Sequence, residues 1–256
     1  MILEVRDLSF HYDVSRTIFH DVNFSVNKGE VLSLLGANGA GKSTLLNCVA
    51  NLFVPKSGEI LINGQPMAKM RLRDIARVIG YVPQIHTPAY AFTVLEFTVM
   101  GRTPYIGSFA TPNAEDYEMA EKALERMKIM HLRDKAYTEI SGGERQQVTI
   151  ARVIAQQPRL ILMDEPTAHL DYGNQYRVVR MIRELADEGF AIIITTHNPE
   201  YAIILGDKTA ILDRGGQLHV GPAEEKLNAQ TLSELYGLTI KTVYDKDARR
   251  NVCVVF

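Results

Sequence analysis

A glycine-rich segment that ends in lysine and serine has the residue types that bind phosphate groups. Residues 36–43, Gly-Ala-Asn-Gly-Ala-Gly-Lys-Ser, match the pattern G-x-x-x-x-G-K-[ST] in full, between an apolar run and a helix pattern. Glycines let backbone N–H groups turn toward an anion, and the following helix adds its positive end. We expect Lys42 to contact the β- and γ-phosphates of a nucleotide, and Ser43 to contact Mg²⁺. The other loop residues predicted to bind the nucleotide are Gly36, Asn38, Gly39, Ala40, Gly41 and Thr44.

Two carboxylates follow a second apolar run. Asp164 and Glu165 come directly after Leu160–Met163, and ligands of an open parallel sheet bind at the carboxyl ends of its strands. An enzyme that hydrolyses a magnesium nucleotide needs one carboxylate for the metal and a base that activates water. We predict that Asp164 takes the first role and Glu165 the second.

A second glycine-bearing helix start follows the pattern Ser141-Gly142-Gly143-Glu144. Ser141 is a typical N-cap residue, and the stripe of Val148, Ala151 and Ile154 predicts a helix over 144–156. A helix N-terminus of this kind also suits an anion. The chain therefore has two helix starts that could face phosphate.

Short, continuous apolar runs predict strands of a parallel sheet that is covered on both faces. These runs are Val31–Leu35, Ile79–Val82, Leu160–Met163, Ala191–Thr195 and Ala210–Leu212. Segments with alternating polarity predict a separate antiparallel layer, and they are 2–10, 22–27 and 58–63. Helical stripes over 114–130 and 174–187 separate some of the runs. We therefore predict an α/β fold with a P-loop NTPase core, a mostly parallel sheet, an N-terminal antiparallel β layer and an inserted α-helical sub-domain.

The expected organisation is a single domain over 1–256. Residues 1–85 and 157–225 form the core with its β layer, and 86–156 form the helical sub-domain that carries the second helix start. Residues 226–256 are predicted to form a helix and a hairpin of strands 239–244 and 251–256.

Composition limits the function classes. The 256 residues are 46% hydrophobic and 23% charged with a net charge of −2, which argues against disorder and against sequence-independent nucleic-acid binding. No apolar stretch approaches the roughly 18–20 residues of a membrane span. The charged N-terminal segment MILEVRDLSFHY does not resemble a signal peptide, and the distant Cys48 and Cys253 fit a reducing compartment.

From residue 1 to about 225 the sequence resembles the nucleotide-binding subunits of ABC transporters. GANGAGKST resembles the Walker A motif of that family, LILMDEP its Walker B motif and ISGGERQQ its signature motif. Residues 168–171 resemble the D-loop, His197 the H-loop and Gln84 the Q-loop, while Tyr12 resembles the aromatic residue that stacks on adenine. The departures are Ile140, Glu144 and His169, where the family usually has Leu, Gln and Ala or Ser.

The resemblance implies a head-to-tail homodimer that binds two ATP molecules with Mg²⁺. Each ATP would lie between Lys42 of one copy and the signature residues of the other, which are Ser141, Gly142, Gly143 and Glu144. Asp171 would cross the interface. His197 would contact the γ-phosphate, and Gln84 would contact Mg²⁺ or the attacking water.

The run from Pro83 to Tyr105 resembles the ATPases of importers for iron-siderophores, haem and cobalamin, and molybdate or tungstate importers share its pattern. This implies an ATPase subunit that docks two integral membrane permease subunits in a groove over 84–105, where Arg102 and Tyr105 are expected to matter. A separate substrate-binding protein would deliver a metal chelate or a molybdate-like oxyanion. The expected location is the cytoplasmic face of the inner membrane, with no nucleic-acid partner.

One alternative stays open, a soluble ABC ATPase without a transport role, such as a cluster-assembly factor of similar length. Chromosome and repair ATPases carry long coiled-coil insertions, and no sustained heptads lie between Ser43 and Ser141. A small kinase would have no use for SGGE together with His197.

Overall fold

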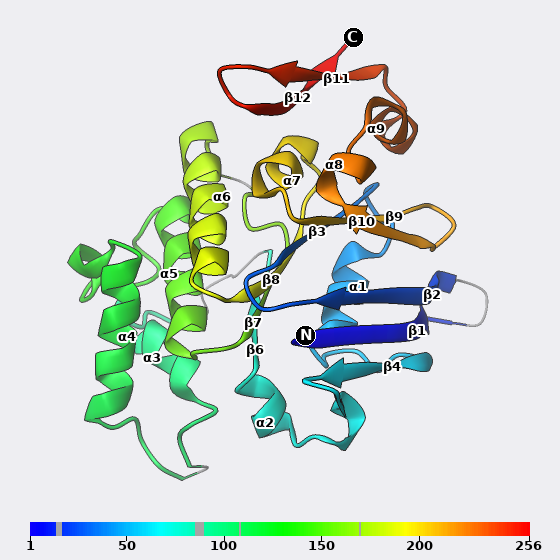
Figure 1. The fold of residues 1–256 in the computed structure, drawn as a ribbon. Helices are drawn as coiled ribbons and strands as arrows, with labels where there is room; N and C mark the ends of the chain where they lie inside the picture. The colour runs from blue at the N-terminus through cyan, green and yellow to red at the C-terminus, as the bar shows by residue number, and fades with distance from the viewer. Residues whose placement is uncertain (14–16, 85–89, 108, 169) are drawn as a thin grey trace.

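The centre of the molecule is a six-stranded sheet. A computed structural model describes residues 1–13, 17–84, 90–107, 109–168 and 170–256, and its largest sheet has the strand order β10-β9-β3-β8-β7-β6 (Figure 1). Neighbouring strands are parallel except at β10, which pairs antiparallel with β9. The predicted α/β fold with a mostly parallel sheet is therefore confirmed. The strands are β3 (Val31–Gly36), β6 (Ile79–Val82), β7 (Leu160–Met163), β8 (Ala191–Thr195), β9 (Lys208–Leu212) and β10 (Leu218–Pro222).

The five apolar runs all form strands of this sheet, whereas β10 was not predicted. β10 has the sequence LHVGP, and its residues are half-exposed or exposed. A strand at the sheet edge has no need of the continuous apolar sequence that marks a strand covered on both faces.

The predicted antiparallel layer is also present, with the strand order β2-β1-β4-β5. Its strands are β1 (Leu3–His11), β2 (Thr17–Val26), β4 (Ser57–Ile62) and β5 (Gln65–Pro66). The prediction for β2 captured only its second half, because Val22, Phe24 and Val26 alternate but the earlier buried residue Phe19 falls out of step. Register shifts in the pairing with β1 explain this break, since a bulge changes which face the side chains take.

Side chains of the central strands alternate between two hydrophobic cores. Leu160 and Leu162 of β7 pack with the antiparallel layer and with α1 (Lys42–Val49). Ile161 and Met163 pack on the other face against the helices α5 (Gly142–Ala155) and α6 (Tyr172–Asp187). The helix that follows the phosphate loop and the helix that begins with Gly142 therefore cover opposite faces of one sheet.

The helices on the second face include α3 (Val94–Val99) and α4 (Ala114–Arg126), which pack against α5. The prediction of a helix over 114–130 is wrong at its C-terminal end, because Lys128 has a φ of +58° and the chain leaves α4 there. These helices share one core with the sheet, so the boundaries of a helical sub-domain over 86–156 stay a prediction. The shorter elements are α2 (Leu72–Ala76) and the 3-10 helices η1 (Met67–Lys69), η2 (Met100–Arg102) and η3 (Met130–Leu132).

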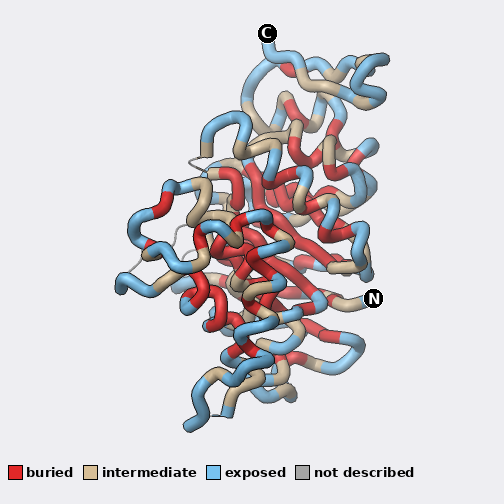
Figure 2. Tube along the Cα trace, turned by 90° about the vertical axis from the view of Figure 1, so that its left-hand side faces the viewer, coloured by how far each residue is buried: buried red, intermediate tan, exposed pale blue. Residues whose placement is uncertain are grey.

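The C-terminal part of the chain lies beyond one end of the central sheet (Figure 1). It comprises α7 (Pro199–Leu205), α8 (Ala223–Lys226), α9 (Ala229–Tyr236) and a hairpin of β11 (Ile240–Asp245) and β12 (Arg250–Val255). The predicted hairpin is thus confirmed, with its strands close to the expected bounds. Most of its residues are exposed or half-exposed (Figure 2).

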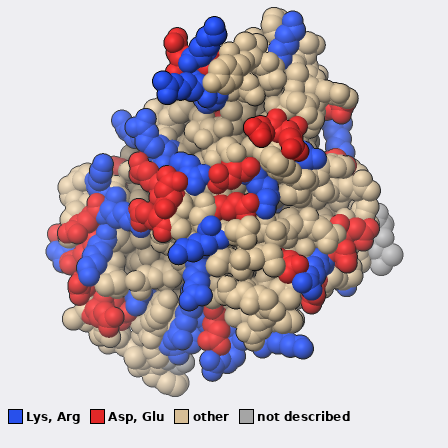
Figure 3. All heavy atoms as spheres, in the orientation of Figure 1, with Lys and Arg blue, Asp and Glu red and all other residues tan. Residues whose placement is uncertain are grey.

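Charged side chains of both signs are interspersed on the face seen in Figure 1 (Figure 3). Several form exposed ion pairs, such as Lys122 with Glu118 on α4, at 2.6 Å. Exposed pairs of this kind contribute little to stability, because water and salt screen them.

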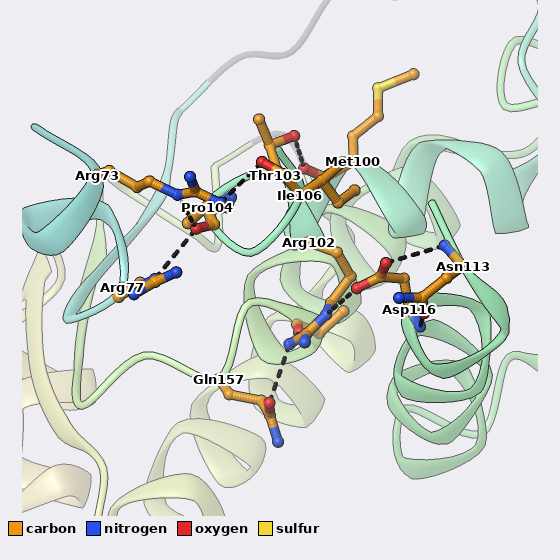
Figure 4. A network of polar contacts seen from close by, with 11 residues as sticks. Arg73, Arg77, Met100, Arg102, Thr103, Pro104, Ile106, Asn113, Asp116 and Gln157 are labelled. Carbon is orange, nitrogen blue, oxygen red and sulfur yellow. Dashed lines mark hydrogen bonds and ion pairs between the residues drawn. The ribbon is translucent and has the colours of Figure 1, made fainter. Parts of the chain in front are cut away.

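A buried polar network holds α4 against α5 (Figure 4). Arg102 is only 4% exposed, and its guanidinium donates to the Asp116 carboxylate at 3.1 Å and to the Ala155 carbonyl oxygen at 3.0 Å. It also lies 4.1 Å from the centre of the Tyr105 ring. Arg102 therefore lines no exposed groove, because its side chain turns inward and satisfies buried groups, and the expected effect of its substitution on stimulated ATPase activity stays a prediction.

Replacing Arg102 with methionine should lower the free energy of unfolding by about 3 kcal/mol or more, because Asp116 would remain as an unpaired buried charge. Denaturant titration of the full chain measures this. Lys122→Met removes one partner of the exposed pair on α4 and should change stability by less than about 0.5 kcal/mol. Equal losses in the two variants would show that burial of the Arg102 pair is not what matters.

Candidate functional site

The phosphate loop connects β3 to α1 at the carboxyl edge of the central sheet. Gly41 is the N-cap of α1 with a φ of +104°, and a Cβ there would overlap the Ile18 side chain. A Cβ at Gly36 would come 2.6 Å from the carbonyl oxygen of Leu212. Both positions therefore require glycine, and the loop can curl tightly around the start of the helix. Together with the first turn of α1, the loop holds the predicted residues Gly36, Asn38, Gly39, Ala40, Gly41, Lys42, Ser43 and Thr44.

Lys42 is folded back over this loop. It is 6% exposed, and its Nζ donates to the carbonyl oxygens of Gly36 at 2.9 Å and Ala37 at 3.2 Å. Burial lowers the pKa of Lys42, and the nearby carboxylates of Glu165 and Asp164 oppose that shift. A phosphate oxygen carries more negative charge than a carbonyl oxygen, so an incoming phosphate is the stronger acceptor for this ammonium.

Asp164 joins the phosphate loop to two neighbouring strands. Its Oδ1 accepts hydrogen bonds from the Ser43 hydroxyl at 3.0 Å and from the Thr195 hydroxyl at 2.6 Å. These three residues follow or end β3, β7 and β8, which are adjacent in the sheet. The structure therefore places the predicted metal ligands Ser43 and Asp164 within hydrogen-bond distance of each other.

The two remaining predicted catalytic side chains, Gln84 and His197, lie next to Glu165. Its Oε2 accepts a hydrogen bond from the Gln84 amide at 2.9 Å and lies 3.6 Å from Nδ1 of His197. Glu165 also has a φ of +44°, in the left-handed region that residues with a side chain adopt uncommonly. Three residues far apart in sequence thus meet at one carboxylate oxygen.

Thr195 is a site residue that the sequence did not reveal. Its side chain is fully buried, and its hydroxyl donates to Asp164 while accepting from the backbone N–H of Glu165 at 2.8 Å. One hydroxyl thereby positions both carboxyl-bearing residues. A polar residue that ends the apolar run AIIIT was the available signal, but the run is equally compatible with a threonine that only packs in a strand.

Tyr12 lies beside α1, the helix that follows the phosphate loop, and the residue is 59% exposed. Its hydroxyl is 3.1 Å from that of Thr44, and the rings of Phe10 and Phe53 pack edge-on against it. The ring is thus held in place while much of it faces solvent, which is the condition for stacking on a base.

The second helix start has the capping expected of it. The Ser141 hydroxyl accepts from the backbone N–H of Glu144, and the Glu144 carboxylate accepts from the backbone N–H of Ser141. The bond to Ser141 lowers the pKa of Glu144, so the carboxylate stays charged in this capping box. Ser141 is thereby confirmed as an N-cap, and Glu144 has a structural partner of its own.

Asp171 caps α6 next to this helix start. Its carboxylate accepts from the backbone N–H and from the side-chain amide of Asn174, and the Asn174 amide lies close to Gly143. Among the described residues, no hydrogen bond or ion pair links Ser141–Glu144 or Asp171 to the Glu165 cluster. The structure thus forms two separate groups of predicted site residues. His169, one of the noted departures, lies outside the residues that the structure describes.

Comparison with known proteins matches this geometry to one family. The family model described as ABC transporter matches residues 19–168. The molybdate import ATP-binding protein MolC of Haemophilus influenzae is 35% identical, over 92% of this chain and 88% of its own. The hemin import ATP-binding protein HmuV of Nocardia farcinica is 36% identical, over 87% of this chain and 76% of its own.

A solved structure assigned to the metal-chelate type of ABC transporter, in an inward-facing conformation, has a TM-score of 0.88 and 33% identity. It covers all of this chain, which covers 97% of that one. The complete fold is therefore shared with that structure. The chain belongs to the family of ABC transporter ATP-binding subunits, the ATPases that are coupled to transport.

Proposed function

We propose that this chain binds and hydrolyses ATP as the motor subunit of an importer. The observation that carries the proposal is the convergence of Gln84 and His197 on the Glu165 carboxylate, next to Ser43 and Asp164. These groups come from four segments of the chain and meet at the carboxyl edge of the sheet. Such an arrangement provides a phosphate cradle, a metal ligand set and a base in one place.

The donor set fits Mg²⁺. The Ser43 hydroxyl and the Asp164 carboxylate are hard oxygen ligands 3.0 Å apart, and the side-chain carbonyl of Gln84 is the third predicted ligand. Mg²⁺ in nucleotide sites is held by few protein oxygens together with phosphates and water. Consistent with this, the part of the chain that the structure describes holds no cluster of three or more His, Cys, Asp or Glu side chains suited to a metal. When bound, Mg²⁺ would neutralise phosphate charge.

Hydrolysis needs a base beside the γ-phosphate. Glu165 takes the proton of the attacking water, which contributes about 10²- to 10⁴-fold to the rate. Gln84 holds the carboxylate oriented through its amide, and His197 donates to a γ-phosphate oxygen as charge develops there. Lys42 exchanges its two carbonyl partners for the β- and γ-phosphates.

The separate location of the signature residues supports a dimeric site. Ser141, Gly142 and Gly143 begin α5, on the sheet face opposite to α1, and Asp171 lies beside them. In a head-to-tail pair with two-fold symmetry, this helix start of one copy faces the phosphate loop of the other. ATP then bridges the two copies, and its hydrolysis removes the bridge. Glu144 supports this helix start through its capping box.

Tyr12 completes the nucleotide site by stacking its exposed ring on adenine. The contacts with Thr44, Phe10 and Phe53 hold the ring without covering it. Stacking needs only the flat face of a base, so it adds affinity with little discrimination.

A groove of about 560 Å³ between α3, η2 and α4 is suited to a short helix of a permease subunit. Its large apolar side chains Phe92, Met100 and Tyr117 are each more than one-third exposed. Arg73 of α2 donates to the carbonyl oxygens of Pro104 and Ile106, which fixes one wall (Figure 4). The groove therefore overlaps the predicted docking region 84–105 but extends to α4. Residues 85–89 lie outside the described part of the chain.

The names of the relatives support a proposal for the cargo. Their names include molybdate import and hemin import, so we propose a metal chelate or a molybdate-like oxyanion that a substrate-binding protein delivers to two permease subunits. None of the described helices is long and apolar enough to cross a membrane. Because these relatives are named as import subunits, we propose that the chain lies at the cytoplasmic face of the inner membrane, held by its permease partners. A cluster-assembly role is not favoured, because the matched relatives are transporter subunits.

Changing Glu165 to glutamine should reduce ATP turnover by about 10²-fold or more, because the amide cannot take a proton from water. ATP affinity should stay within a fewfold, and dimers should accumulate with ATP because the bridge persists. Turnover assays and size-exclusion chromatography measure the two effects. Near-normal turnover would show that another group is the base.

Changing Thr195 to valine keeps the side-chain shape but removes the hydroxyl that positions Asp164 and Glu165. We expect turnover to fall by about 10- to 100-fold, the scale of a hydrogen bond to a charged group. Thr195→Ser keeps the hydroxyl and should retain most of the activity. Similar losses in both variants would mean that the methyl group, and not the hydroxyl, is important.

Changing Met100 to aspartate places a charge on the apolar groove. We expect ATPase stimulation by the permease and its cargo to be lost, while ATP binding by the free subunit is unchanged. Val54→Asp, at an exposed apolar position outside the groove, is the matched control. Normal stimulation of Met100→Asp in the assembled complex would rule out docking at this groove.

A further inference from the structure

The C-terminal α9 and the β11–β12 hairpin, residues 229–255, pack against the segment that carries His197. We call this unit the tail and residues 196–200 the histidine segment. Leu232 of α9 and Ile240 of β11 form a small core with Ala202 of α7. Leu35, the residue before the phosphate loop, belongs to the same core. The tail is therefore fastened to the end of the central sheet at which the catalytic groups lie.

Residues of the tail also make polar contacts with the histidine segment. The Tyr236 hydroxyl donates to the backbone carbonyl oxygen of His197 at 2.9 Å. The Arg250 guanidinium pairs with the Glu200 carboxylate at 2.6 Å, and the backbone N–H of Cys253 donates to the same carboxylate. Both ends of the histidine segment are thus bound to the tail.

The other hydrogen bonds of this segment do not reach the carbonyl oxygen of His197. The backbone N–H of Asn198 donates to the Thr196 hydroxyl, and the Asn198 side chain accepts from Glu200 as the cap of α7. The carbonyl oxygen of His197 instead accepts its hydrogen bond from the Tyr236 hydroxyl. Because that carbonyl belongs to the peptide that follows His197, fixing it restricts the rotation that sets the direction of the imidazole.

The imidazole has little support of its own. Its side chain is 59% exposed, and its Nδ1 lies 3.6 Å from the Glu165 carboxylate, beyond ordinary hydrogen-bond length. A ring with so few contacts depends on its backbone for its position. Catalytic groups must be held within a fraction of an ångström of the productive geometry.

We propose that Tyr236 is a positioning residue for His197, and that the tail serves the ATPase reaction by fixing the histidine segment. This inference rests on the proposed role of His197 at the γ-phosphate. The Tyr236 hydroxyl is protonated at neutral pH, as in any tyrosine, so it can donate to this carbonyl oxygen. The tail thereby acts on turnover without touching the nucleotide.

The test compares Tyr236→Phe with Tyr244→Phe in the full chain. Tyr244 lies on β11 of the same tail, is exposed and makes no hydrogen bond through its hydroxyl to any described residue. We expect Tyr236→Phe to lower kcat by about three- to tenfold, the scale of one hydrogen bond, with the KM for ATP changed less than twofold. Tyr244→Phe should match the unmodified chain. Arg250→Met, which releases the hairpin from Glu200, should lower kcat in the same way.

A second background shows whether the effect passes through His197. In His197→Ala, measured by single turnover, adding Tyr236→Phe should cause no further loss, because there is no imidazole left to position. Unchanged kcat in Tyr236→Phe, or a full additional loss in the His197→Ala background, would overturn the inference while leaving the proposed function intact. Normal turnover of His197→Ala alone would overturn the proposed role of His197 and the inference together.

Discussion

The arrangement of the candidate site depends on the hydrogen bonds that the Asp164 carboxylate accepts. This carboxylate accepts from Ser43 at the start of α1 and from Thr195 at the end of β8, while it follows β7 itself. The strand order β3-β8-β7 makes this possible, because it brings three carboxyl ends side by side. Thr195 extends the connection to the backbone of Glu165. A shift of any one strand would therefore misplace the proposed metal ligands and the proposed base together.

The alternation of side chains along the strands has a second consequence. Odd and even positions of β7 bury against different layers, so α1 and α5 cover opposite faces of one sheet. Each helix start presents backbone N–H groups, but the two starts make no hydrogen bond to each other within the described residues. This separation supports the proposed two-fold pair, in which each site would combine the phosphate loop of one copy with the second helix start of the other.

Glu165 lies between two routes to the periphery. Gln84, which lies just after β6, donates to its carboxylate. His197, on its other side, begins the segment that the tail holds. The buried Arg102–Asp116 pair keeps the groove helices in register with α5, so movement there would pass to the signature helix.

The sequence by itself determined most of the central strands and the local patterns of the candidate site. The glycine-lysine-serine loop, the Asp164–Glu165 pair and the Ser141 cap are local patterns, because loop curvature, strand burial and helix capping depend on nearby residues. Tertiary structure alone decided what depends on contacts between distant segments. It brought Thr195 to Asp164 and Tyr236 to His197. It also turned Arg102 inward and, through a bulge, changed which face the first residues of β2 take. No spacing along the chain encodes these contacts, since they arise only when strand order and packing set which side chains meet.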